Sequence, residues 1–283
     1  KMKLIVDSAC DLSLSYLEEH NVIVVPLSVI VDDKEYMDMF EIKNDQIYAL
    51  IKEGKHPRTS QVPLDKFDTA FRKLAAEGES ALYIALSSDL SGTYQAAVLA
   101  GSQVREEYPD FNLRIIDSRQ ASLGIGLMVR EAIQMIEDGF DAEVISERIT
   151  FMADNVTSIF TVEDLNYLAE GGRLSKSSAF LGGLLNIHPL LEVVDGKLEA
   201  QEKFRGRKRV LNRMYDRLSE ATHMNEQTVL IVHTNDFETV NEMKKHIEAE
   251  FGPKEVIDYP IGAVVAAHTG IGTLGLFFMN QYK

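Results

Sequence analysis

Residues 82–97 constrain the fold more than any other stretch of the chain. The apolar run 82–86 predicts a short, buried parallel strand. A polar turn at 87–90 follows it, and Ser91-Gly92-Thr93 then leads into a run of good helix formers. A strand, a turn and a helix start direct free backbone N–H groups into the crevice at the carboxyl edge of a sheet. Because serine caps helices in proteins of every kind, this stretch indicates a binding site only together with others.

The rest of the first half also alternates strands with helices. The pattern predicts strands at 4–6 and 113–116, and helices at 44–51, 64–76 and 120–137. A second apolar run, 22–31, contains Pro26 and is expected to be an edge strand or a bent strand. The loop 57–63 is bracketed by prolines and is therefore expected to be extended. Alternation of this kind favours a parallel sheet covered on both faces, with ligands at the carboxyl ends of its strands. Those ends carry Asp7-Ser8, Ser87-Ser88 and Asp117-Ser118.

The second half has a mixed pattern. The Asp195-Gly196 pair predicts a tight turn between strands 187–194 and 197–204. Further strands are expected at 158–162, 228–232, 256–261 and 274–280, with a helical turn at 165–169 and helices at 208–222 and 238–251. We therefore predict an α/β fold in which a parallel-sheet α/β/α domain, residues 1–155, is followed by a mixed α+β domain, residues 156–283.

Composition excludes several functional classes. The net charge is −15, and no stripe of Lys and Arg with interleaved aromatic residues occurs, which argues against a nucleic-acid partner. The basic patch 205–209 is either a solvated face or a docking surface for an acidic partner. The single cysteine, Cys10, excludes an internal disulfide and a cysteine-based zinc site. No run of 18 apolar residues and no signal peptide is found, so we expect a cytoplasmic protein without a membrane anchor.

The short motifs of common enzymes are missing or out of context. Residues 270–275 fit G-x-G-x-x-G, but a strand follows them instead of the helix that a dinucleotide site requires. The sequence contains no P-loop, no G-x-S-x-G and no H-E-x-x-H, so we expect no cofactor and no metal. His268 lies between a run of small apolar residues and Gly270. Its ring is expected to face the interior or a crevice, either as a core residue or as a site residue.

Six motifs occur in an order that resembles a known family. They are Val6-Asp7-Ser8, Arg58-Thr59-Ser60-Gln61, Ser87-Ser88 with 90–94, Ile116-Asp117-Ser118, Glu170-Gly171-Gly172-Arg173-Leu174-Ser175 and Ala267-His268-Thr269-Gly270. Together they resemble the DegV-type fatty-acid-binding proteins, the lipid-carrier subunit of a bacterial fatty acid kinase. The resemblance covers essentially the whole chain. One departure is Val62, which stands before Pro63 where the family often has proline.

The resemblance implies a fatty acid in a tunnel between the two domains. Its carboxylate would be bound by Thr59 and Ser91, with His268 nearby and the Gly92 N–H as a further donor. A second group, Ser60, Thr93 and Arg173, would contact the head group or a partner. The Gly-Gly-Arg motif would equally serve as a helix C-cap followed by an exposed cation. Candidate tunnel-lining residues are Phe160, Leu165, Phe180, Leu181, Leu184, Leu185, Ile187 and Leu190.

The same resemblance implies a carrier and not an enzyme. A separate ATP-dependent kinase subunit would phosphorylate the bound fatty acid, and the acyl phosphate would pass to phospholipid synthesis, where an acyltransferase is a further possible partner. Two other functions stay open from the residues. One is a hydrolase or acyl transferase that uses Ser91 with His268. The other is a binding or regulatory module for a small acid that has no kinase partner.

Overall fold

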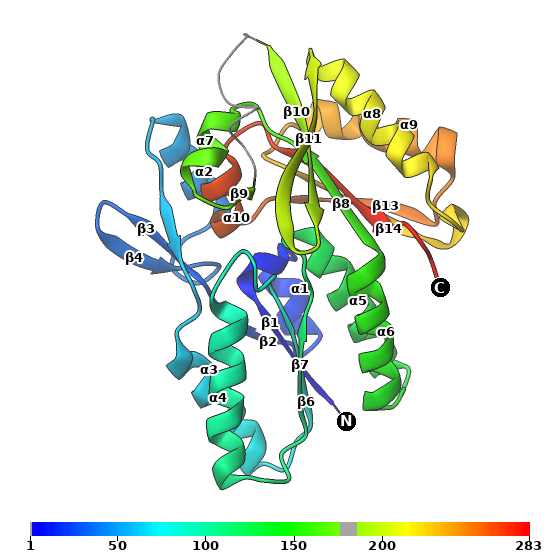
Figure 1. Ribbon diagram of the computed structural model, residues 1–283. Coiled ribbons are helices and arrows are strands. Elements are labelled where there is room, and N and C mark those ends of the chain that lie inside the picture. The colour runs from blue at the N-terminus through cyan, green and yellow to red at the C-terminus, as the bar shows by residue number, and fades with distance from the viewer. Residues whose placement is uncertain (1, 176–185) are drawn as a thin grey trace.

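The first sheet contains four parallel strands in the order β2-β1-β6-β7. The computed structural model describes residues 2–175 and 186–283. The strands are β1 (Lys3–Asp7), β2 (Ile23–Val25), β6 (Ala81–Ala85) and β7 (Leu113–Asp117). Helices α3 (Leu64–Ala76) and α4 (Thr93–Glu107) lie on one side of this sheet, and α1 (Leu14–Glu19), α5 (Leu123–Glu137) and α6 (Ala142–Asn155) lie on the other (Figure 1). The predicted parallel α/β/α arrangement is confirmed.

The apolar run 22–31 forms two strands, so its interpretation as one strand is wrong. Strand β2 is the edge of the parallel sheet, whereas β3 (Ser28–Val31) belongs to a three-stranded antiparallel sheet. That sheet has the order β4-β3-β5, with β4 (Lys34–Met37) and β5 (Arg58–Ser60). Pro26 lies between β2 and β3, where its missing N–H ends one hydrogen-bond ladder. Strand β5 is the extended part of the proline-bracketed loop.

The second sheet is mixed and has the order β13-β12-β14-β8-β10-β11-β9. Its strands are β8 (Val156–Thr161), β9 (Leu174–Ser175), β10 (Ile187–Val194), β11 (Lys197–Arg205), β12 (Thr228–His233), β13 (Glu255–Pro260) and β14 (Leu274–Met279). Strands β10 and β11 form the predicted hairpin, and both turn residues, Asp195 and Gly196, have positive φ. Helices α8 (Arg207–Ser219) and α9 (Phe237–Phe251) cover one face, and α5 packs against strands β8, β12 and β14 of the same sheet.

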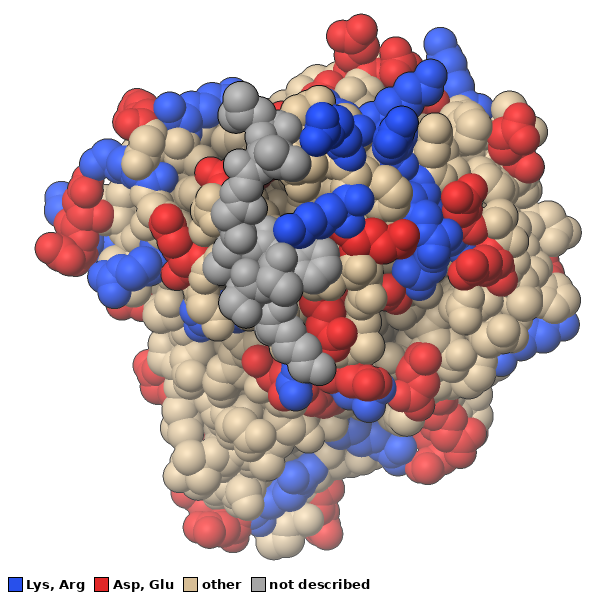
Figure 2. All heavy atoms as spheres, turned by 45° about the horizontal axis from the view of Figure 1, so that its top comes forward, with Lys and Arg blue, Asp and Glu red and all other residues tan. Residues whose placement is uncertain are grey.

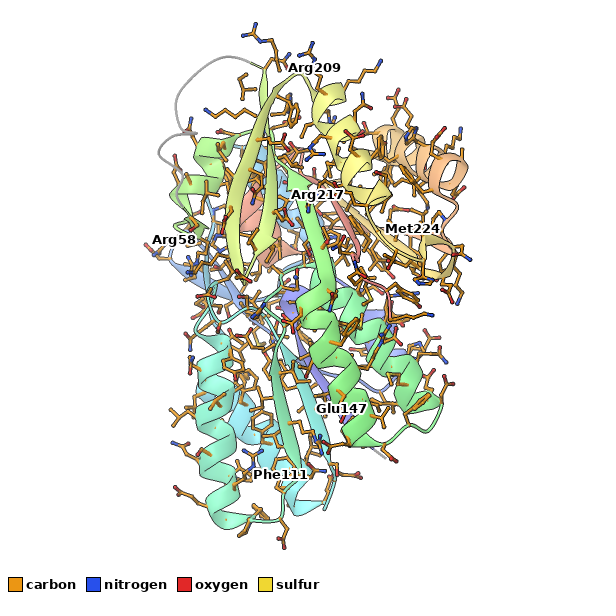
Figure 3. The ribbon with its side chains drawn as sticks, turned by 45° about the vertical axis from the view of Figure 1, so that its right-hand side comes forward. Arg58, Phe111, Glu147, Arg209, Arg217 and Met224 are labelled. Atoms are coloured by element: carbon orange, nitrogen blue, oxygen red, sulfur yellow. The ribbon has the colours of Figure 1, made fainter. Side chains whose placement is uncertain are left out.

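The two sheets meet at the carboxyl ends of the parallel strands. Phe111, which precedes β7, lies at the end of the molecule opposite Arg209, so the parallel strands run toward the second sheet (Figure 3). Helices α2 (Asn44–Lys52), α7 (Leu165–Glu170) and α10 (Ala263–Thr269) lie at this junction, where α10 contacts both of the others. Short 3₁₀ turns occupy Ser8–Cys10 and Met224–Glu226.

One of the hydrophobic core clusters extends across both halves of the chain. This largest cluster of buried side chains joins Ile5 and Val6 of β1 with Val232 of β12 and Phe277 of β14. Strand β8, which begins at Val156, is the first strand of the second sheet. The division into residues 1–155 and 156–283 stays a prediction, because the shared core leaves open whether either half folds alone.

Candidate functional site

A cavity lies at the junction of the two sheets. Its volume is about 150 Å³, and both halves of the chain contribute to its wall. The apolar lining residues are Ala9, Leu27, Leu86, Leu90, Ala121, Phe160, Val193, Leu198, Val232, Ile261, Val264, Val265 and Phe277. A cavity with mostly aliphatic and aromatic walls and few polar groups suits a ligand with a large hydrocarbon part.

Most of the predicted site residues line this cavity. Thr59 and Ser60 come from β5, Ser91 and Gly92 precede α4, and His268 lies in the last turn of α10. Gln61 and Arg173 also belong to the lining. Thr93 does not line the cavity; it is fully buried behind Ser91. We call the group Thr59, Ser91, Gly92 and His268 the head-group cluster.

Thr59 and His268 form the central hydrogen bond of the head-group cluster. The Thr59 Oγ1 and His268 Nε2 atoms are 2.7 Å apart. Burial, with smaller effects of the nearby Arg173 and His56, lowers the pKa of His268 to about 4, so its ring is neutral at pH 7. In the tautomer that carries hydrogen on Nε2, the ring donates to Thr59 Oγ1. The Thr59 hydroxyl hydrogen then remains available to an anionic ligand.

Ser91 is positioned by the start of α4. The Thr93 N–H donates to Ser91 Oγ at 3.1 Å, and the hydroxyl oxygens of Ser91 and Thr93 are 2.8 Å apart. The Val62 N–H in turn donates to Thr93 Oγ1 at 3.2 Å, which ties the loop after β5 to this helix start. Since the first N–H groups of a helix lack partners within the helix, α4 adds a positive dipole end beside Ser91.

Gly92 permits a close approach between this helix start and the loop after β5. A Cβ atom at position 92 would lie 2.1 Å from Gln61 Oε1, far inside van der Waals contact. The family resemblance implies that the Gly92 N–H donates to a bound carboxylate, which stays a prediction. The observed neighbour is the Gln61 side chain, which any other residue type at position 92 would displace.

Arg173 connects the second half of the chain to the β6–α4 loop. Its side chain is exposed, its Nε donates to the Leu90 carbonyl at 3.2 Å, and its Nη1 donates to the Gly171 carbonyl at 2.9 Å. Gly171 caps the C-terminus of α7. Arg173 therefore combines a helix-capping contact with a place in the cavity wall, and the two roles predicted for it do not exclude each other.

The polar residues at the strand ends stabilise loops instead of lining the cavity. Asp7 accepts hydrogen bonds from the N–H groups of Ala9 and Leu86, and the Ser87 hydroxyl donates to the Gly196 carbonyl at 2.7 Å. Asp117 accepts from the Ser88 N–H at 3.2 Å. The general expectation of polar strand ends at the junction is correct, but these side chains have partners in the protein.

The predicted apolar lining is correct only in part. Phe160 lines the cavity, whereas Leu190 belongs to a separate core cluster with residues of α8 and α9. Leu165 and Ile187 are outside the lining. Phe180, Leu181, Leu184 and Leu185 lie outside the described residues. Strand periodicity cannot distinguish a buried residue that faces a cavity from one that faces solid core.

Basic side chains gather on the face that carries the junction of the two halves (Figure 2). Arg58, Arg173, Arg205 and Arg209 are exposed. In residues 2–175 and 186–283, no helix is long and apolar enough to cross a membrane. Within the same ranges, no group of three His, Cys, Asp or Glu side chains is placed to hold a metal ion.

The fold and the site define an α/β protein with a largely apolar cavity that is also lined by neutral hydroxyl groups. The model of the DegV family of uncharacterised proteins matches residues 1–281, and the chain belongs to this family. A DegV domain-containing protein from Clostridium perfringens is 37% identical over 288 residues, which cover 100% of this chain and 99% of the relative.

Two solved structures are similar over nearly the full length. A DegV family protein from Thermus thermophilus, described with fatty acid binding, has a TM-score of 0.90 at 30% identity and covers 99% of each chain. A stearic acid-binding protein from Eubacterium ventriosum has a TM-score of 0.86 at 29% identity, with 99% of this chain and 98% of that chain covered. The predicted family and fold class are therefore confirmed.

Proposed function

We propose that this protein binds a long-chain fatty acid, with the hydrocarbon tail in the cavity and the carboxylate at the head-group cluster. The observation that carries the proposal is that one cavity combines a mostly apolar wall with the polar side chains of Thr59, Ser91 and His268. The fatty acids bound by the relatives from T. thermophilus and E. ventriosum support it.

The tail supplies most of the affinity and the head-group cluster supplies orientation. Burial of each methylene contributes about 0.8 kcal/mol, so a stearate tail contributes roughly 12 kcal/mol before the costs of binding. A hydrogen bond to a charged carboxylate contributes roughly 1.5–3 kcal/mol. Neutral hydroxyls and the α4 dipole satisfy the carboxylate without the bidentate pairing that an arginine would impose.

We further propose that the protein presents this carboxylate to a separate ATP-dependent kinase and carries the resulting acyl phosphate toward phospholipid synthesis. Support comes from the exposure of Gln61 and Arg173 beside the head-group cluster, which gives a partner access to the carboxylate end. The chain has no P-loop to bind ATP itself. A cytoplasmic location and the absence of a cofactor belong to the same proposal.

A serine hydrolase is the less favoured alternative. A nucleophilic serine needs a hydrogen bond to its base, and the base needs a third group to orient it. In the described residues, Ser91 pairs with Thr93 and His268 pairs with Thr59, so the two residues do not form this pair. The lowered pKa of His268 also makes it a weak base at neutral pH.

Native mass spectrometry tests fatty-acid binding. We expect the delipidated protein to gain the mass of one stearate or palmitate, and the Ser91→Ala variant to retain less ligand at the same concentration. A mass that stays at that of the bare chain after addition of either acid would refute the proposal. The small-acid alternative predicts a mass gain with a short carboxylic acid and none with stearate.

A separate assay tests the kinase step. The loaded protein is incubated with ATP and a DegV-associated fatty acid kinase subunit, and acyl phosphate is trapped with hydroxylamine. We expect hydroxamate from the wild type and at least tenfold less from Thr59→Val at equal occupancy. Fatty-acid binding without hydroxamate would refute the carrier role and leave binding intact.

A further inference from the structure

The hydroxyl groups of the cavity wall differ in the direction of their hydrogen bonds. At the head-group cluster, hydroxyl oxygens are hydrogen-bonded to protein groups. Ser91 Oγ accepts a hydrogen bond from the Thr93 N–H, and Thr59 Oγ1 is hydrogen-bonded to the His268 ring. With hydrogen on His268 Nε2 and the Thr93 hydroxyl donating to Ser91 Oγ, the hydrogens of the Thr59 and Ser91 hydroxyls are available to a ligand. An anionic carboxylate, which only accepts hydrogen bonds, fits this end.

Two serines elsewhere in the wall have the opposite arrangement. The Ser158 hydroxyl donates to Gln120 Oε1 at 2.6 Å, and the Ser122 hydroxyl donates to Asp11 Oδ2 at 2.6 Å. The Gln120 Nε2 donates to the Val156 carbonyl, which fixes the orientation of the amide. The Ser158 hydrogen therefore points into the protein. The Ser122 hydrogen does the same while Asp11, a carboxyl whose pKa is raised by burial, is ionised, and oxygen lone pairs then remain for the cavity.

Both serines lie beside the start of α5, and we call them the inner polar spot. A Cβ atom at Gly124 would lie 2.5 Å from Ser158 Oγ and 2.5 Å from Gln120 Oε1, so glycine at this position leaves room for their bond. Ser122 stands two residues before Gly124 at the start of α5. Ser122 and Ser158 are 5% and 1% exposed, so bulk water does not satisfy their lone pairs.

The inner polar spot lies away from the head-group cluster. Asp11, the partner of Ser122, contacts Gly262 at the N-terminus of α10, whereas His268 is six residues later in the last turn. Six helical residues span about 9 Å. An extended hydrocarbon chain, with C–C bonds of about 1.5 Å, advances about 1.3 Å per bond, so this distance corresponds to roughly seven carbon–carbon bonds. The spot therefore faces the middle of an eighteen-carbon chain.

We infer that the cavity distinguishes fatty acids by the polar group that they carry in mid-chain. It takes a hydroxy fatty acid, whose hydroxyl donates to Ser122 or Ser158, and it disfavours an oxo fatty acid, whose carbonyl meets only acceptors. An unsubstituted tail contacts the serine carbons and is also accepted. This inference rests on the proposed fatty-acid binding and adds a substrate class to it.

The test compares the dissociation constants of stearate, 10-hydroxystearate and 10-oxostearate for the delipidated full-length protein. We expect 10-hydroxystearate to bind within about threefold of stearate, and 10-oxostearate to bind at least about tenfold more weakly, because its carbonyl is buried without a hydrogen-bond donor. Equal binding of the hydroxy and oxo acids would overturn the inference. Failure of stearate itself to bind would instead refute the proposed function.

Serine variants identify the groups responsible. In Ser122→Ala/Ser158→Ala, we expect 10-hydroxystearate to bind at least about tenfold more weakly and stearate to change by less than threefold. Ser87→Ala is the matched control, because Ser87 is equally buried and donates a bond of 2.7 Å to Gly196 but does not line the cavity. Equal losses for both acids in the double variant would contradict the assignment. Far-ultraviolet circular dichroism of the double variant shows whether equal losses come from misfolding. The single variant Ser158→Ala is measured in the same way as a second check.

Discussion

At the scale of single residues, the head-group cluster consists of neutral hydrogen-bonding groups and contains no lysine or arginine. Thr59, Ser91 and His268 line the cavity, and the one cation in the described wall, Arg173, is bonded to backbone carbonyls. A buried carboxylate bonded by hydroxyls retains lone pairs for a further reaction. This arrangement suits a site where the carboxylate is held first and modified by a partner afterwards.

Thr59→Val tests the contribution of one hydroxyl. Valine has nearly the shape of threonine, so the cavity is preserved and one donor is lost. We expect stearate affinity to fall about 10- to 100-fold, the equivalent of roughly 1.5–3 kcal/mol, in a fluorescence displacement assay. Thr161→Val is the control. Thr161 does not line the cavity, and its Oγ1 is buried without a hydrogen-bond partner. An unchanged affinity in Thr59→Val would contradict the role of Thr59.

The lowered pKa of His268 predicts a pH dependence of stability. Burial lowers the folded-state pKa to about 4 from 6.5, so as the pH falls the unfolded chain takes up this proton first. The unfolding free energy of the delipidated wild type should therefore decrease between about pH 6.5 and pH 4, by at most roughly 3 kcal/mol from this group. Urea unfolding of wild type and His268→Gln at pH 7.0, 5.5 and 4.5 measures the difference. A wild-type advantage that does not shrink toward pH 4.5 would be inconsistent with a neutral, buried imidazole.

At the scale of elements, α7 and α10 position the His268 ring. The Tyr167 hydroxyl of α7 donates to the Ala267 carbonyl of α10 at 3.0 Å, and Tyr167 stacks on His56 with ring centres 3.8 Å apart. The His56 Nδ1 in turn lies 2.8 Å from Glu170 Oε2. These contacts hold α7 against α10 and against the segment before β5, so the ring is enclosed from two sides.

Gly171→Ala tests this packing. A Cβ atom at position 171 would lie 2.6 Å from His268 Nδ1, although the backbone of Gly171 is in the ordinary helical region. We expect stearate to bind about tenfold more weakly, because the ring must shift away from Thr59. A double-mutant cycle with His268→Ala checks the cause. If Gly171→Ala weakens binding equally in the His268→Ala background, the effect does not pass through the ring.

Sequence periodicity predicted most elements, including α2 and α7 at the junction, but it missed several others. Most strands of the two sheets and helices α2, α3, α5, α8 and α9 were predicted, with ends displaced by a few residues. Elements β4, β9 and α1 were missed, and β2 and β3 were predicted as one strand. Helix α6 was missed. Helix α10 was described only as a run of small residues, because the apolar pattern of Ala263–Thr269 is nearly continuous. A helix that is buried on most sides has no amphipathic period to detect.

The site residues were predictable for a different reason. Thr59, Ser91 and His268 stand in short motifs whose order indicates a family, although their sequence separations give no sign that they meet. Ser122 and Ser158 have no such signal. Their place in the cavity wall follows from the tertiary packing of α5 on β8, which residue types alone do not encode.

At the scale of the whole molecule, the two halves share their largest core cluster. Val232 and Phe277 of the second sheet pack in the same cluster as Ile5 and Val6 of the first. We therefore expect a single calorimetric unfolding transition for the full-length protein, with equal calorimetric and van't Hoff enthalpies. Two resolved transitions would indicate that residues 1–155 and 156–283 unfold as independent domains, in contradiction to this expectation.

The measurement that tests the account most directly is a crystal structure of the protein with bound stearate. The account predicts the tail between the two sheets and the carboxylate oxygens at about 2.5–2.9 Å from Thr59 Oγ1 and Ser91 Oγ. A stearate bound outside the cavity, or one whose carboxylate lies at the inner serines with its methyl end at Thr59, would contradict it.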